Sequence, residues 1–104
     1  MTNFDDRERA YEAKFAHDEE MQFRANARRN KLLGLWAAGL LGKTGAEADA
    51  YAIEVVKSDF QEAGDDDVLR KVAGDLGAKA TAAEVRVQMD ALLAEAKRQL
   101  ASDA

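Results

Sequence analysis

No proline occurs in the 104 residues of this chain, so no residue forces a helix to bend or stop by removing a backbone donor. Glycine supplies the interruptions instead. Gly42, Gly64 and Gly77 each follow a helical pattern, at the place where a C-terminal cap needs a positive φ. No window alternates apolar and polar residues with the β-branched enrichment of a strand. The sequence therefore predicts an all-α domain.

Signals for helix starts follow the glycines. Thr44 with Glu47, and Thr81 with Glu84, have the spacing of a capping box. In that motif the Thr side chain accepts from a backbone N–H, and the Glu side chain accepts from the N–H of the Thr. Two helices are therefore expected to begin just after Thr44 and Thr81.

A third start lies in the run of three aspartates. Asp65 is expected to cap this helix, with Asp66 and Asp67 favoured in its first turn by the helix dipole. A calcium site is not favoured here, because the spaced ligands of an EF-hand are missing. Four helices are thus predicted, over roughly 3–41, 46–63, 66–76 and 82–101.

The last three helices each have one apolar face, with residues recurring at spacings of three and four. Short connections between such helices favour antiparallel neighbours, so the prediction is a small antiparallel four-helix bundle. Its predicted core comprises Tyr51, Val55, Val56 and Phe60, with Ile53 to one side, then Val68, Leu69, Val72 and Leu76, then Val85, Met89, Leu92, Leu93, Ala96 and Leu100.

The first helix is too long for this bundle. At 1.5 Å per residue it would extend about 58 Å, whereas the second and fourth would reach only about 27–30 Å. Asp18 and Gln22 interrupt its apolar face. We therefore expect residues 1–19 to form an arm, frayed or disordered when free, and residues 20–104 to form the bundle. The face that enters the bundle is predicted to comprise Met21, Ala25, Leu32, Trp36 and Leu40.

Trp36 has two interpretations. It shares a face with Leu32 and Leu40, which favours burial in the core. A tryptophan on a surface would instead be typical of a binding anchor. We expect the core position.

Three aromatic residues of the arm lie on one face. Phe4, Tyr11 and Phe15 fall within about 40° of each other around a helix. They either fold back on the bundle or are presented to a partner as anchors of a helix that binds in a groove. The length argument favours the second interpretation.

Charge is distributed in blocks. Residues 1–20 carry seven acids and three bases, residues 21–43 five bases and no acid, and residues 44–104 thirteen acids and seven bases. The net charge of −5 disfavours nucleic-acid binding. The basic cluster Arg24, Arg28, Arg29 and Lys31 is either a docking patch for an acidic surface or a solvated face that balances acidic helices of the bundle.

Several classes of function are disfavoured by residue usage. The chain has no cysteine, which excludes disulfides, thiolate nucleophiles and cysteine-ligated metals. Its one histidine, His17, has only Glu20 at ligand spacing, which is too few for a metal site. His17 is either a solvated arm residue or a pH-sensitive partner contact. No catalytic constellation appears, so we expect no enzyme activity and no cofactor or metal.

Targeting signals are also missing from the sequence. No run of about 18 apolar residues exists, so we expect no direct membrane insertion. The acidic start MTNFDDRERA is neither a signal peptide nor a transit peptide, and a cytoplasmic protein is expected.

Gly42-Lys43-Thr44 matches the end of a phosphate-binding loop. The first glycine of that motif would fall at position 37, which is Ala37, and the loop would have to follow a strand. Helix capping accounts for Gly42 and Thr44 without a ligand. We favour the capping interpretation.

Three segments resemble a known family: FDDRERAYEAKFAHD at 4–18, RRNKLLGLWAA at 28–38 and EAGDDDVL at 62–69. Together they are similar to the zeta subunit of the F-type ATP synthase of alphaproteobacteria, over essentially the whole chain. The resemblance implies a four-helix bundle that inhibits ATP hydrolysis by the catalytic head. Such a subunit is cytoplasmic and lies at the inner membrane through the ATP synthase.

The resemblance also implies a mechanism. The N-terminal segment inserts as a helix at a catalytic interface between alpha and beta subunits and reaches the gamma subunit. Rotation is blocked in the direction of hydrolysis, while synthesis is largely spared. The role is similar to that of the mitochondrial inhibitor protein, on a different fold. By position, the partner-binding residues would be Phe4, Asp5, Arg7, Glu8, Arg9, Tyr11, Lys14, Phe15 and His17.

Two alternative functions are compatible with the same composition and residue spacing. One is a helical adaptor of another cytoplasmic complex. The other is a small nucleotide-binding helical domain built on Gly42-Lys43-Thr44.

Overall fold

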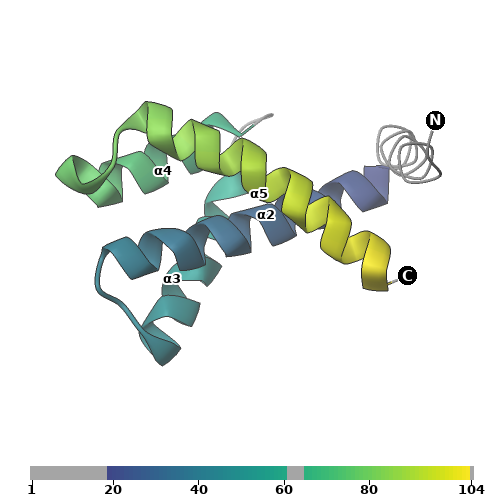
Figure 1. Ribbon diagram of the computed structural model, residues 1–104, viewed down its shortest axis with the longest axis horizontal. Coiled ribbons are helices and arrows are strands. Elements are labelled where there is room, and N and C mark those ends of the chain that lie inside the picture. The colour runs from purple at the N-terminus through teal and green to yellow at the C-terminus, as the bar shows by residue number, and fades with distance from the viewer. Residues whose placement is uncertain (1–18, 61–64, 104) are drawn as a thin grey trace, which may run out of the picture.

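The computed structural model describes residues 19–60 and 65–103, and all the regular structure in these two ranges is helical (Figure 1). This confirms the predicted fold class. The helices predicted over 66–76 and 82–101 agree with the structure to within two residues, the helix predicted over 46–63 ends earlier, at Lys57, and the predicted start at residue 3 lies outside the described residues. The elements are α2 (Glu19–Leu40), α3 (Gly45–Lys57), the 3₁₀ turn η1 (Ser58–Phe60), α4 (Asp66–Leu76), the 3₁₀ turn η2 (Gly77–Lys79) and α5 (Ala82–Asp103).

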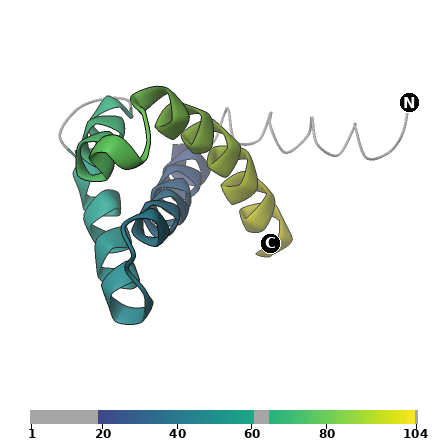
Figure 2. The ribbon, with the colours of Figure 1, turned by 60° about the vertical axis from the view of Figure 1, so that its left-hand side comes forward.

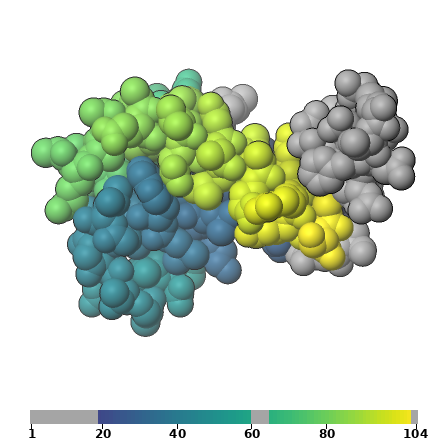
Figure 3. Space-filling view, viewed as in Figure 1, coloured from purple at the N-terminus to yellow at the C-terminus, as the bar shows by residue number. Residues whose placement is uncertain are grey.

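Helix α2 is the centre of the arrangement and contacts each of the other three helices. It lies between α3 and α5, which pack on different sides of it (Figure 2). In the space-filling view, the start of α5 (light green) lies above α2 and α3 (blue and teal), and its C-terminal end (yellow) extends down to the right (Figure 3). The core therefore forms where the four helices converge on the C-terminal half of α2.

Glycines end two of these helices as the sequence predicts. Gly42 has φ 78° and Gly77 has φ 56°, both in the region that favours glycine. At the end of α2 the Gly42 N–H donates to the Gly39 oxygen at 3.2 Å, and the Lys43 N–H donates to the Ala38 oxygen at 2.8 Å. This pair of bonds is a Schellman motif. Gly64 lies outside the described residues.

Only one of the two predicted capping boxes forms. At the start of α5 the Thr81 N–H donates to Glu84 Oε1 at 3.2 Å, and the Glu84 N–H donates to Thr81 Oγ1 at 3.1 Å. Thr44 occupies the N-cap position of α3, but its side chain makes no capping bond. The Glu47 N–H instead donates to the Thr44 backbone oxygen, at 3.2 Å. The capping box predicted at Thr44 is therefore wrong, although the helix begins where expected.

The two threonines should differ in their contribution to stability. We expect Thr81→Ala to lower the free energy of unfolding by about 1 kcal/mol, because the Glu84 N–H loses the Thr81 hydroxyl that accepts its hydrogen bond. Thr44→Ala should cost clearly less, because no side-chain bond is lost. Urea denaturation of both variants measures the difference, and equal losses would contradict the structural distinction.

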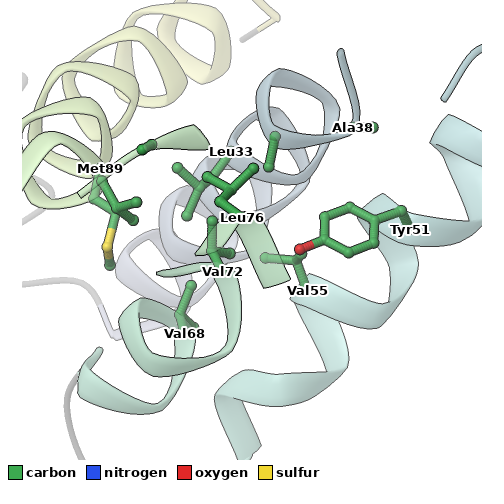
Figure 4. Packing of buried hydrophobic residues seen from close by; sticks show 11 residues of the cluster. Leu33, Ala38, Tyr51, Val55, Val68, Val72, Leu76 and Met89 are labelled. Atoms are coloured by element: carbon green, nitrogen blue, oxygen red, sulfur yellow. The ribbon is translucent and has the colours of Figure 1, made fainter. Parts of the chain in front are cut away.

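The core unites residues from all four helices and is shown in Figure 4. Most of the predicted core positions of α3, α4 and α5 are fully or partly buried. Ile53, expected to one side, lies at the surface. The side chain of Phe60 is not among those that the structure describes. The buried apolar cluster comprises Leu33, Ala37, Ala38, Tyr51, Val55, Val68, Val72, Leu76, Ala80, Val85 and Met89.

The predicted face of α2 is displaced from the observed one. Of the predicted face, Ala25 is buried, but Leu32 and Trp36 are only half-buried and Leu40 is 40% exposed, whereas Leu33 and Ala37 are buried. Most of the buried face is thus rotated by one residue, about 100° around the helix. Trp36 packs against the core, as expected, but from its margin, so the prediction of its full burial is wrong. Small residues form much of the buried face because the neighbouring helices approach closely there.

The closest approach is between α2 and α3. A Cβ added to the buried Gly34 would lie 2.6 Å from the Cα of Ala52, closer than real Cβ atoms come. Ala52 is itself buried, and Val55 lines the same contact. Only glycine at position 34 lets the two backbones pack at this distance.

We expect Gly34→Ala to lower the free energy of unfolding by about 1–3 kcal/mol, because α3 must move away from α2. Gly39 belongs to the same helix but is exposed, and an added Cβ there meets no atom within 4 Å. Gly39→Ala is therefore the control. It should be neutral or stabilising by up to about 1 kcal/mol, because alanine favours the helix. Thermal or urea unfolding tests the pair, and a stabilising Gly34→Ala would refute the close contact.

Candidate functional site

The residues predicted to contact a partner lie outside the described residues. Residues 1–18, which are all of the arm except Glu19 and include the aromatic stripe, are in this position. Its proposed role therefore stays a prediction. The affected residues are Phe4, Asp5, Arg7, Glu8, Arg9, Tyr11, Lys14, Phe15 and His17.

The basic cluster of α2 divides into two parts with different surroundings. Arg24 is exposed and pairs with Glu20 at 2.8 Å, and Lys31 is also exposed. Arg28 is half-buried. Arg29, in contrast, is only 3% exposed. Both interpretations of the cluster placed Arg29 at the surface, and for this residue both are wrong.

Arg29 is part of a polar network beneath the surface. Its Nε donates to Oδ1 of the neighbouring Asn30 at 2.7 Å, and Nη1 lies 3.4 Å from Oδ2 of Asp65. The buried Asn30 also donates through Nδ2 to Asp59 Oδ2 at 3.0 Å. A guanidinium this deeply buried needs such partners, because an unpaired charge there would be strongly destabilising.

The network continues to α5. Arg86 donates to Asp65 Oδ1 at 3.0 Å and to Asp66 Oδ1 at 3.2 Å. Burial disfavours the charged form of Asp65. The hydrogen bond and charge of Arg86, with the charge of Arg29, outweigh this and lower the pKa of Asp65 below its ordinary value. Asp65 is therefore charged at neutral pH and holds two arginines from different helices.

This use of Asp65 corrects one sequence expectation. Asp65 stands at the N-cap of α4, but its side chain makes no capping bond. Its two carboxylate oxygens are directed to Arg29 and Arg86 instead. Asp66 and Asp67 do occupy the first turn of α4, as predicted. The network thus joins α2, η1, the start of α4 and α5.

The network was not predicted from the sequence, although the position of Arg29 on α2 is a signal for its centre. Ala25, Arg29, Leu33 and Ala37 are spaced by four and therefore share one face of the helix. A charged residue in such a row predicts a buried ion pair. Its partner Asp65, however, is 36 positions away and cannot be identified from spacing.

Lys43 also has surroundings that bear on its predicted role. Burial disfavours the charged form of Asp75. Hydrogen bonds from Lys71 and Tyr51 and the positive charges of Lys71 and Lys43 outweigh this and lower its pKa. An acidic neighbour disfavours a phosphate site at Lys43. Gly42 ends α2 as a cap, which is the interpretation favoured from the sequence.

Tyr51 belongs to the same cluster. Its hydroxyl donates to Asp75 Oδ2 at 2.9 Å, and Lys71 Nζ lies 5.4 Å from its ring centroid. Burial, followed by the bond to Asp75, raises the pKa of Tyr51 well above its ordinary value. The cluster therefore holds a neutral tyrosine and a paired carboxylate, an arrangement that ties α3 to α4.

The described ranges 19–60 and 65–103 show neither a metal site nor a membrane span. Within them, no three acidic or histidine side chains gather closely enough to hold a metal ion. Nor does any helix there combine the length and apolarity that crossing a bilayer requires.

We expect Asp65→Ala to lower the free energy of unfolding by about 2–4 kcal/mol, because Arg29 loses its carboxylate partner while remaining buried. Asp66→Ala removes an exposed carboxylate that pairs with the same Arg86, and it should cost less than about 1 kcal/mol. Urea denaturation at neutral pH compares the two variants. Similar losses of unfolding free energy in the two variants would show that the buried Arg29–Asp65 pair contributes no more to stability than the exposed Arg86–Asp66 pair.

Comparisons with known proteins extend over both parts of the chain. A family model described as ATPase inhibitor subunit zeta matches residues 1–99. A protein whose structure was solved in solution by NMR is 61% identical, with a TM-score of 0.76. The match covers 81% of this chain and 99% of the other. The comparison with curated proteins gave no match.

Proposed function

Because this chain belongs to the family of ATPase inhibitor zeta subunits, we propose that it restrains the F-type ATP synthase by inserting its N-terminal arm into the catalytic head. Residues 1–19 are the inhibitory arm and residues 20–104 the bundle that carries it. The arm enters as a helix at an interface between alpha and beta subunits and reaches gamma. It blocks rotation in the direction of hydrolysis and largely spares synthesis.

The observation that carries this proposal is the extent of the family match, which begins at residue 1 and so includes the arm. The same match extends to residue 99 and therefore also includes the bundle that carries the arm.

The energetics constrain how such an arm binds. Fixing 18 residues costs on the order of 20–30 kcal/mol of backbone entropy. Three buried aromatic residues return at most about 4–6 kcal/mol each. Helix hydrogen bonds and charged contacts of Arg7, Arg9 and Lys14 must supply the rest. Any partial helix in the free arm lowers this cost.

The direct test adds the purified chain to isolated catalytic heads and measures ATP hydrolysis. Removal of residues 1–17 should abolish inhibition and leave the melting temperature almost unchanged, because the polar residues Asp18 and Gln22 interrupt the apolar face between the arm and the bundle. Loss of the fold on truncation would show that the aromatic stripe belongs to the core. Intact inhibition after truncation would place the inhibitory surface on the bundle.

Single substitutions refine the same test. Alanine at Phe4, Tyr11 or Phe15 should weaken inhibition without unfolding the chain, and Arg9→Ala should act more mildly and less at high salt. Lys43→Ala is the control and should change neither stability nor inhibition appreciably. A large loss of inhibition in Lys43→Ala, with the fold intact, would favour the nucleotide-binding alternative.

A further inference from the structure

One face of α2 is covered by other elements along only part of its length. Phe23, Ala27, Asn30, Gly34 and Ala38 follow one another at spacings of three and four, so they lie on a single stripe. Gly34 packs on Ala52 of α3, and Asn30 bonds to Asp59 of η1. Toward the N-terminus the stripe continues to Phe23, which is 62% exposed.

The lengths of the helices explain this exposure. Helix α2 has 22 residues and α3 has 13, so α2 is longer by about 13 Å. In Figure 1 the N-terminal end of α2 extends past α3, on the same side of the molecule as the C-terminal end of α5. The stripe that buries small residues under α3 therefore ends in a large aromatic residue at the surface.

Polar residues surround this aromatic side chain. Glu20 and Arg24 form an exposed ion pair on one side, Lys31 is exposed on the next turns, and Ala27 between them is half-buried. A central aromatic residue with a charged rim is typical of the energetically dominant residues of protein interfaces. Val87 of α5, which is 68% exposed, is an isolated surface residue with no such stripe behind it.

We propose that Phe23 and its charged rim form a second docking surface for the catalytic head of the ATP synthase, continuous with the arm. This inference rests on the proposed function of the arm. Phe23 lies four residues after Glu19, about 6 Å along the helix, so an arm bound in a cleft brings Phe23 to the mouth of that cleft. One aromatic residue and one alanine are too small an area for a stable dimer, which argues against a second copy.

An ordered surface has an advantage over the arm as a binding element. The helix around Phe23 is already formed in the described structure, so its contacts add affinity without the entropy cost of folding a segment. The arm then blocks rotation, and the contacts of the first turns of α2 slow the dissociation of the chain from the catalytic head.

The test measures inhibition of ATP hydrolysis by the full chain carrying Phe23→Ala. We expect the concentration for half-inhibition to rise about tenfold, the usual cost of losing an aromatic anchor, with an unchanged melting temperature. Val87→Ala is the matched control and should inhibit like the unmodified chain. Equal inhibition by the Phe23→Ala and unmodified chains would overturn the proposal.

A second measurement separates this surface from the function of the arm. A photo-crosslinking benzoylphenylalanine at position 23 should form adducts with the catalytic head, and one at position 87 should not. Adducts at 23 in a chain that fails to inhibit would support the surface and refute the proposed function. Inhibition that Tyr11→Ala weakens, with no adduct at 23, would refute the surface alone. Self-association that Phe23→Ala abolishes, measured by sedimentation, would assign the surface to a second copy and also refute it.

Discussion

The backbones of α2 and α3 meet at Gly34 and Ala52, and much of the remaining structure depends on this contact. Because Gly34 has no side chain, α3 lies close enough for Tyr51 and Val55 to enter the core. The same placement brings Asp59 of η1, directly after α3, to Asn30 of α2. From there the polar network fixes the start of α4. A single missing Cβ thus sets the position of two helices.

Polar and apolar packing have complementary roles around α2. Its C-terminal half is buried by small and aliphatic residues, whereas Arg29 and Asn30, near its middle, are buried only because carboxylates from η1 and α4 reach them. Buried charge contributes less to net stability than apolar packing, but it tolerates few alternative arrangements. We infer that the apolar core stabilises the bundle and that the Arg29 network determines how its helices pack against one another.

The sequence predicts those features that depend on neighbours within a few residues. Gly42, Gly77 and the Thr81–Glu84 pair mark helix ends through local backbone geometry, and α4 buries the apolar row that spacing indicates. The pattern of large apolar residues does not predict the buried face of α2, because Gly34 and Ala37 are buried by close helix packing. The position of Asp65 before a helix predicts a cap, whereas its actual partners, Arg29 and Arg86, are distant in sequence. The residues of the proposed inhibitory site stay predictions, since they lie outside the described structure.

The central position of α2 has a mechanical consequence. The helix that leads out of residues 1–18 is also the one that contacts α3, α4 and α5 and holds the buried Arg29. A force that pulls on α2 along its axis from the N-terminal side therefore loads its contacts with α3, α4 and α5 at the same time. These contacts resist the force together as the helices slide past one another. The Gly34–Ala52 packing and the Arg29–Asp65 pair would have to yield together. Resistance to forced unfolding is governed by the rate at which contacts break, so contacts loaded in parallel slow the unfolding of the bundle under such a force.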